Sequence, residues 1–139
     1  MHDCAELFSD VMNKKTRVWL SSSVQKDVMK YRRKNDPNGL FWKKLCWCSV
    51  EAGFEHAELA EMVRHEGNGV YRFGIKESLF RLIGFYDGGK SNFIVIDSFL
   101  KQGQTLNAAE RKRVEEVARV AKAKLWREVG PDGIPRNLR

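Results

Sequence analysis

The sequence predicts an α+β domain. In it a small antiparallel sheet, made of an N-terminal strand and a three-strand meander, packs against an antiparallel helix pair and is followed by a long C-terminal helix. Three patterns predict this class: strand-like alternation over residues 69–101, two helical apolar stripes between residues 21 and 53, and a third stripe over residues 107–125. The chain has 139 residues, the size of one domain. We therefore expect a single domain over residues 1–139.

The meander is the most strongly patterned segment. Residues 71–76 alternate between apolar and polar side chains, which is typical of a half-buried strand. Residues 79–86 are nearly all apolar and predict a central strand, and residues 92–99 are β-branched and aromatic. The Asp-Gly-Gly sequence at 87–89 predicts a hairpin turn, because glycine accepts positive φ without a Cβ clash.

The segments before the meander predict one strand and two helices. Residues 1–15 read as a weakly helical lead that docks on the body or frays, and residues 16–20 as a strand that edges or joins the sheet. Ser22 and Gln25 fit a capping box at the start of the first helix. A second helix is expected over residues 40–51, and the short turn between the two implies an antiparallel pair.

Two further segments remain. Residues 53–68 fit either a short helix or an irregular approach to the sheet. After the meander, Asn107 and Glu110 predict an N-terminal box for the long helix, and Gly130 with Pro131 predicts its stop. Residues 130–139 have no periodicity, so we expect a flexible tail there.

Composition narrows the classes of partner. Lys and Arg number 25 against 18 Asp and Glu, which gives a formal net charge of +7. This charge favours a polyanionic partner such as nucleic acid or an acidic protein, although a basic protein without such a partner has the same composition. The apolar runs are too short to span a bilayer and the first residues resemble no signal peptide. We expect a cytoplasmic protein that does not bind membranes.

The three cysteines, Cys4, Cys46 and Cys48, are too few and too irregularly spaced for a disulfide framework or a usual zinc site. Buried reduced thiols are the favoured interpretation. We expect neither a metal site nor a cofactor.

Three short runs resemble a known family. The runs are Val70 to Phe73, Phe80 to Leu82 and Ile94 to Lys101, and they resemble the RelE/ParE toxin superfamily, most of all its HigB-like, phage-derived branch. The similarity continues after the third run into a Gln- and Thr-containing link and an Ala-, Arg- and Glu-rich segment, so that the whole region reads SFLKQGQTLNAAERKRVEEVA. The resemblance covers Thr16 to about Leu125. It implies the toxin of a type II toxin–antitoxin system, neutralised by a cognate antitoxin for which a small helix-turn-helix protein is expected.

The resemblance also implies two kinds of target. Many members are ribosome-dependent mRNA endonucleases that cut the codon in the ribosomal A site, so the ribosome and mRNA are the expected partners. Other members poison DNA gyrase. We keep open a toxin-fold protein that acts by binding, as a gyrase inhibitor or a phage protein that blocks a host factor, and a basic binding protein without toxicity.

Metal-independent RNA cleavage needs fixed cations where charge accumulates on the phosphoryl oxygens. Arg72, Arg81 and Lys101 match basic positions of the family, and an antiparallel meander can bring them to one surface. Arg81 is the strongest candidate, because a charge inside an apolar strand is costly unless it is paired or used. Lys76 is more simply explained as a solvated surface charge. The expected catalytic residues are Arg72, Arg81, Lys101 and Tyr86, and the expected RNA-binding residues are Lys76, Lys90 and Gln102.

The sequence also departs from the family pattern. Gly74 stands where many members have a basic residue, and Gln102 stands where RelE has an arginine. None of His2, His56 and His65 falls at the C-terminal position where HigB-like members place a histidine. Tyr86 and Asp97 are possible proton carriers, although packing in a strand explains both equally well.

Overall fold

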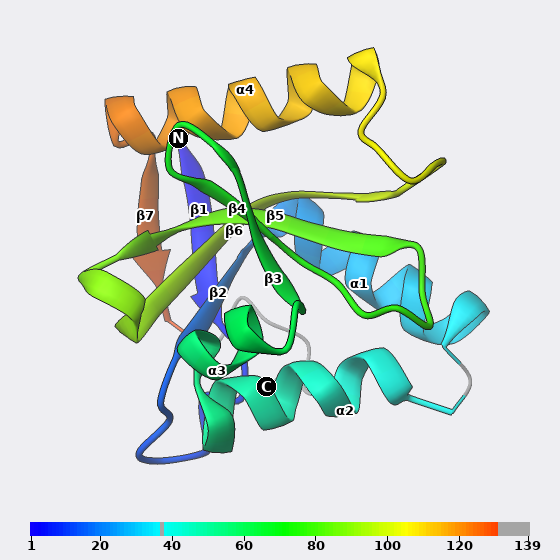
Figure 1. Cartoon of the computed structure of the whole chain (residues 1–139). Helices are drawn as coiled ribbons and strands as arrows, with labels where there is room; N and C mark the ends of the chain where they lie inside the picture. The colour runs from blue at the N-terminus through cyan, green and yellow to red at the C-terminus, as the bar shows by residue number, and fades with distance from the viewer. Residues whose placement is uncertain (37, 131–139) are drawn as a thin grey trace.

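The computed structural model describes residues 1–36 and 38–130. Helices cover both faces of a central sheet, with α4 on one face and α1, α2 and α3 on the other (Figure 1). In chain order the elements are β1 (His2–Glu6), β2 (Arg17–Ser21), α1 (Ser22–Asn35), α2 (Leu40–Trp47), the π-helical turn η1 (Cys48–Ala52), α3 (Phe54–Leu59), β3 (Val63–Gly67), β4 (Val70–Phe73), β5 (Phe80–Asp87), the 3-10 turn η2 (Gly89–Ser91), β6 (Asn92–Leu100), α4 (Ala108–Ala123) and β7 (Trp126–Val129).

The sheet is mixed and has seven strands in the order β3-β4-β5-β6-β2-β1-β7. This corrects the expectation of a smaller, wholly antiparallel sheet. The meander β4-β5-β6 is antiparallel as predicted, but β2 pairs with β6 in parallel, with Trp19 opposite Ile94. β1 and β7 are also parallel. The chain must therefore cross over between β2 and β6, and the helical segment between them lies on one face of the sheet.

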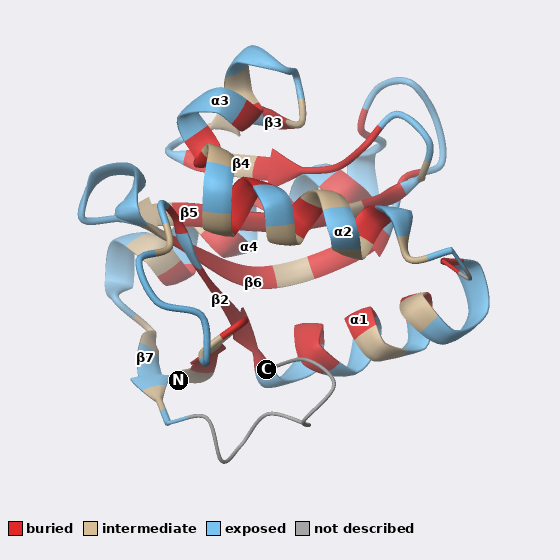
Figure 2. Cartoon of the chain, turned by 90° about the horizontal axis from the view of Figure 1, so that it is seen from below, coloured by how far each residue is buried: buried red, intermediate tan, exposed pale blue. Residues whose placement is uncertain are grey.

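One face of the sheet carries α1 and α2. Val24 and Val28 of α1 and Leu45 of α2 are completely buried or nearly so in the core on this side, and Figure 2 shows the buried sides of both helices turned toward the strands. The chain reverses direction between the two helices, as predicted. They contact each other near the joining turn, where the rings of Tyr31 and Phe41 lie 5.6 Å apart.

The other face carries α4. The predicted box is present, since the Asn107 side chain accepts a hydrogen bond from the Glu110 backbone N–H at 2.8 Å and the Glu110 carboxylate accepts one from the Asn107 backbone N–H at 3.0 Å. Val117 and Val120 pack in the second apolar cluster, on the same face as Ile83. A long C-terminal helix was expected to follow the sheet, but α4 is followed by a further strand of the sheet, β7.

Several expectations for the first half of the chain are corrected. Residues 1–15 do not form a helical lead, because β1 runs through them and Cys4 and Ala5 are fully buried. Ser21, one residue before the expected Ser22, caps α1 by accepting a hydrogen bond from the Val24 N–H. Residues 53–68 contain both a short helix, α3, and an edge strand, β3.

At the other end, Gly130 is the last described residue, and the expected tail beyond it lies outside the described residues. Burial raises the pKa of Cys48 to about 11 and that of Cys4 to about 12, as befits core thiols. All three cysteines are free. None of the helices described combines the length and the apolar character that crossing a bilayer would require.

A candidate phosphate-binding site: the basic pocket

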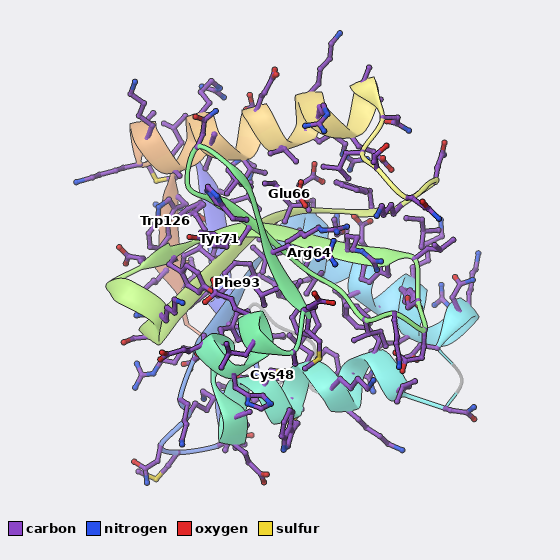
Figure 3. The ribbon with its side chains drawn as sticks, viewed as in Figure 1. Cys48, Arg64, Glu66, Tyr71, Phe93 and Trp126 are labelled. Atoms are coloured by element: carbon purple, nitrogen blue, oxygen red, sulfur yellow. The ribbon has the colours of Figure 1, made fainter. Side chains whose placement is uncertain are left out.

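A pocket of about 500 Å³ opens at the β3 end of the sheet, where β3, β4, the 74–76 segment and α2 come together. Figure 3 shows two residues of the edge strand β3, Arg64 and Glu66, between the layer of α4 and the layer of α2. We call this site the basic pocket. Its described lining residues are Lys44, Trp47, Ala60, Glu61, Met62, Arg64, Arg72, Gly74, Ile75, Lys76, Arg81 and Lys101.

Strand register explains why the cations converge. Arg64 on β3 lies directly opposite Arg72 on β4, and like charges in directly opposed positions repel each other. Arg81 lies near Gly74, across from the end of β4, and on β5 its direct partner is Phe99 of β6. Lys101 is two residues beyond Phe99 and therefore shares its side of the strand. Arg72, Arg81 and Lys101 come together in the basic pocket, but Arg72 and Lys101 are buried instead of lying on an open surface.

Arg72 is the most deeply placed arginine of the basic pocket, with 9% of its surface exposed. Its Nε donates to a carboxylate oxygen of Glu66 at 2.7 Å. The NH1 nitrogen of the same guanidinium is buried and has no hydrogen-bond partner among the described residues. Buried polar groups are nearly always satisfied, so Arg72 keeps hydrogen-bonding capacity beyond its ion pair with Glu66.

Arg81 is held by backbone oxygens instead of a carboxylate. Its NH1 donates to the carbonyl of Ser78 at 2.6 Å and to that of Phe80 at 2.9 Å. The side chain lies across Gly74, where an added Cβ would stand 2.5 Å from Cδ of Arg81. Burial lowers the pKa of Arg81, and the positive charge of Arg72 lowers it further.

Lys101 is also a buried cation whose charged group is held by a backbone carbonyl. It is 8% exposed, and its Nζ donates to the carbonyl of Gln104 at 2.5 Å. Burial lowers the pKa of Lys101, and repulsion from Arg72 and Arg81 adds to the effect. Three buried or half-buried cations are thus held close together with one carboxylate, Glu66, in direct contact with Arg72.

Of the three residues expected to bind RNA, one lines the basic pocket and two lie elsewhere. Lys76 lines the basic pocket. Lys90 lies elsewhere and forms an ion pair with Glu58, whose hydrogen bond raises the lysine's pKa. Gln102 lines a different pocket, together with Asp27 and Arg113.

Tyr86 is also outside the basic pocket. Its hydroxyl is buried without a hydrogen-bond partner among the described residues, and burial raises its pKa above the usual value. It lines a larger hollow of about 1010 Å³ beside α4, whose charged walls include Asp87 and Glu115 as well as Arg119 and Lys122. Two carboxylates against three cations in that hollow suit an anion less well than the basic pocket, whose described lining has one carboxylate, Glu61, against six cations. The geometry therefore does not bring Tyr86, Lys90 or Gln102 to the three convergent cations.

Sequence reasoning missed several residues of the basic pocket, among them Lys44, Trp47 and Arg64. The signal for Arg64 was the alternation Val63, Arg64, His65, Glu66, which is a strand pattern in the segment that also fitted a helix. His65 points away from this face because neighbours in a strand alternate, and its ring centroid lies 4.8 Å from that of Tyr71. Within the described residues, no group of three or more His, Cys, Asp or Glu side chains is placed to hold a metal ion.

Comparison with known proteins gives no relative: no family model, no curated protein and no solved structure matches this chain.

The chemistry of the basic pocket therefore follows from its own residues. Guanidinium groups present fixed N–H donors that match phosphate oxygens, and lysine adds a compact positive charge. In a partly buried site these charges act more strongly on an anion than they would in water. The arrangement can bind a phosphate group and stabilise additional negative charge on it.

Proposed function

We propose that this chain is the toxin of a type II toxin–antitoxin system and that it acts on RNA through the basic pocket as a ribosome-dependent mRNA endonuclease. The observation that carries the proposal is the convergence of Arg72, Arg81 and Lys101 on one pocket. A phosphodiester would supply the negative charge that these cations lack. The resemblance of the strand segments to the RelE/ParE superfamily connects this site with toxin activity.

In the proposed reaction the ribose 2′-OH loses its proton to a water molecule and attacks the adjacent phosphorus. The bond from phosphorus to the 5′ oxygen then breaks, leaving a 2′,3′-cyclic phosphate and a 5′-hydroxyl. Arg72 and Arg81 stabilise the charge that develops on the phosphoryl oxygens. Lys101 donates a proton to the leaving 5′ oxygen, a role favoured by its lowered pKa, because a weaker hold on the proton brings an acid closer to the working pH.

A second function rests on a specific observation. The described residues that line the basic pocket include no histidine, the side chain that most often accepts a proton at neutral pH. This favours a protein that binds a nucleic-acid target without cutting it, such as a gyrase inhibitor or a phage protein that blocks a host factor.

The two functions can be separated by inducing the chain in bacteria and mapping message ends by primer extension. Cuts within translated codons that disappear in an Arg81→Ala variant support the endonuclease. Intact messages with damaged DNA support gyrase poisoning. Arg113→Ala is the matched control, since it removes an arginine that lies outside the basic pocket. Full toxicity of a folded Arg81→Ala variant would rule out this site, and harmless induction of the wild type would rule out the toxin.

A further inference from the structure

Trp47 differs from the other tryptophans of the chain. It is 42% exposed and lines the basic pocket. Trp19, by contrast, is 8% exposed and donates its indole N–H to the Asn92 side chain at 3.0 Å. Trp42 is packed against the ring of Phe8 and the guanidinium of Arg32. Trp126 packs against Phe85 on the far side of the sheet. Trp47 therefore presents aromatic surface that the fold does not use.

The position of Trp47 is fixed by its surroundings. It is the last residue of α2, directly before the π-helical turn η1, and π-helical turns often mark functional sites. Its ring meets the ring of His56 at an interplanar angle of 86°, with centroids 5.2 Å apart. Lys44, one helical turn earlier, lines the same pocket and holds Glu77 at 2.9 Å. The indole is thus supported beside the cations of the basic pocket.

We propose that the basic pocket binds one nucleotide of single-stranded RNA, with its base stacked on Trp47 and its phosphate on Arg72 and Arg81. This inference rests on the proposed function and adds to it a base subsite. An aromatic platform beside a cationic groove is the arrangement that binds single strands without reading sequence, because every base has a π-face. A paired base is stacked within its helix and cannot lie on the indole, so duplex RNA is excluded.

The size of the pocket agrees with this occupant. Its volume of about 500 Å³ lies within the range of small-molecule sites and is suited to a nucleotide rather than to a bare phosphate ion. The cations of the pocket that Trp47 lines are partly buried and repel one another, and both effects lower the pKa of Arg81 and of Lys101.

The test compares Trp47→Ala with Trp47→Phe in the full chain. Binding is measured for a short oligouridylate, for an abasic ribose-phosphate chain of the same length and for an RNA duplex. Trp47→Ala should weaken oligouridylate binding about 5- to 100-fold, and Trp47→Phe should restore most of it. The abasic chain should bind wild type and Trp47→Ala equally. Leu59→Ala is the control, because Leu59 is an exposed apolar side chain, at 82%, outside the pocket lining.

The salt dependence separates this inference from the proposed function. Trp47→Ala should leave the slope of log affinity against log salt unchanged, whereas Arg72→Gln should make it shallower. Equal loss of the abasic chain and the oligouridylate, or unchanged binding by a folded Trp47→Ala variant, would overturn the stacking while leaving the phosphate site intact. A wild-type chain that binds no single-stranded RNA and cuts no message would overturn both proposals.

Discussion

Arg81 and Arg113 lie over the same face of the sheet but in opposite electrostatic situations. Arg113 of α4 forms two hydrogen bonds with the Asp97 carboxylate, at 2.8 and 2.7 Å, and a third with the Ser98 carbonyl at 3.0 Å. The bond with Asp97 raises the pKa of Arg113. Arg81 has carbonyl acceptors and cationic neighbours, and burial with repulsion from Arg72 lowers its pKa.

This difference distinguishes an arginine that stabilises the fold through an ion pair from an arginine whose charge could be balanced by a ligand. Arg113 joins α4 to β6 and has a carboxylate of its own. The cations of the basic pocket are held near one another, and only Glu66 offsets Arg72 directly. An anion that entered would relieve the repulsion. The comparison therefore predicts that changes at the two places will separate stability from binding.

The largest expected effect is the loss of RNA binding in Arg72→Gln. If Arg72 binds a phosphate as proposed, removing its buried charge costs on the order of 2–5 kcal/mol, so oligouridylate affinity should fall at least about 30-fold. Arg113→Gln should leave that affinity unchanged and lower the free energy of unfolding by about 1 kcal/mol, since its side chain is 46% exposed and solvent screens the pair. Fluorescence anisotropy measures the oligouridylate affinity, and urea unfolding measures the free energy of unfolding. Equal losses of affinity in both variants would abolish the distinction.

Gly74→Ala should have the next largest effect. The new methyl group would stand 2.5 Å from Cδ of Arg81, and the arginine must move because it is the flexible partner. We expect an affinity loss of about 10-fold with little change in unfolding, as for one displaced charge-assisted hydrogen bond. The matched control is Gly103→Ala, where the nearest atom would lie 3.8 Å away. A Gly74→Ala variant that binds RNA normally would show that the position of Arg81 is unimportant.

Lys101→Met tests the energetic cost of the cluster. Because the pKa of Lys101 is lowered in the folded state, the unfolded chain holds its proton more tightly, and the charged lysine destabilises the fold at neutral pH. Methionine should therefore raise the melting temperature by a few degrees near pH 7. The gain should shrink toward about pH 10, as the folded wild type loses the proton. Thermal unfolding at several pH values measures this, and a gain that grows with pH would contradict the sign.

The smallest expected effect belongs to Glu66→Gln. The Glu66 carboxylate competes with an incoming phosphate for Nε of Arg72, so neutralising it should tighten oligouridylate binding about three- to tenfold. Glu116→Gln is the control, because that carboxylate pairs with Arg119 outside the basic pocket. Weaker binding in Glu66→Gln would mean that the carboxylate orients Arg72 instead of competing for it.

The meander and the helices could be predicted from the sequence because their signals are local. Alternation over residues 71–76, the turn at 87–89 and the box at Asn107 each depend on neighbouring residues alone. The parallel pairing of β2 with β6 could not be predicted, since it joins residues more than 70 positions apart. β1 and β7 were missed because each is short and pairs with the other. Their residues can be recognised as strands only once the neighbouring strands of the sheet are known.

The same reasoning explains the outcome at the candidate site. Arg81 stood out because it is a charge within an apolar strand, and its convergence with Arg72 and Lys101 followed from antiparallel register. Lys44 and Trp47 could not be assigned, because they lie on α2 and reach the pocket only through tertiary packing. Lys90 and Tyr86 were expected there on chemical type, but Lys90 pairs with Glu58 and Tyr86 lines the hollow beside α4.

The position of β1 between β2 and β7 has a consequence for synthesis on the ribosome. Cys4 pairs with Ser21 on one side and with Glu128 on the other, so β1 keeps an open edge until β7 has been synthesised. The residues that line the basic pocket lie between positions 44 and 101, and all are made before that closure. The half of the sheet that carries the basic pocket is therefore translated in full before β7 pairs with β1.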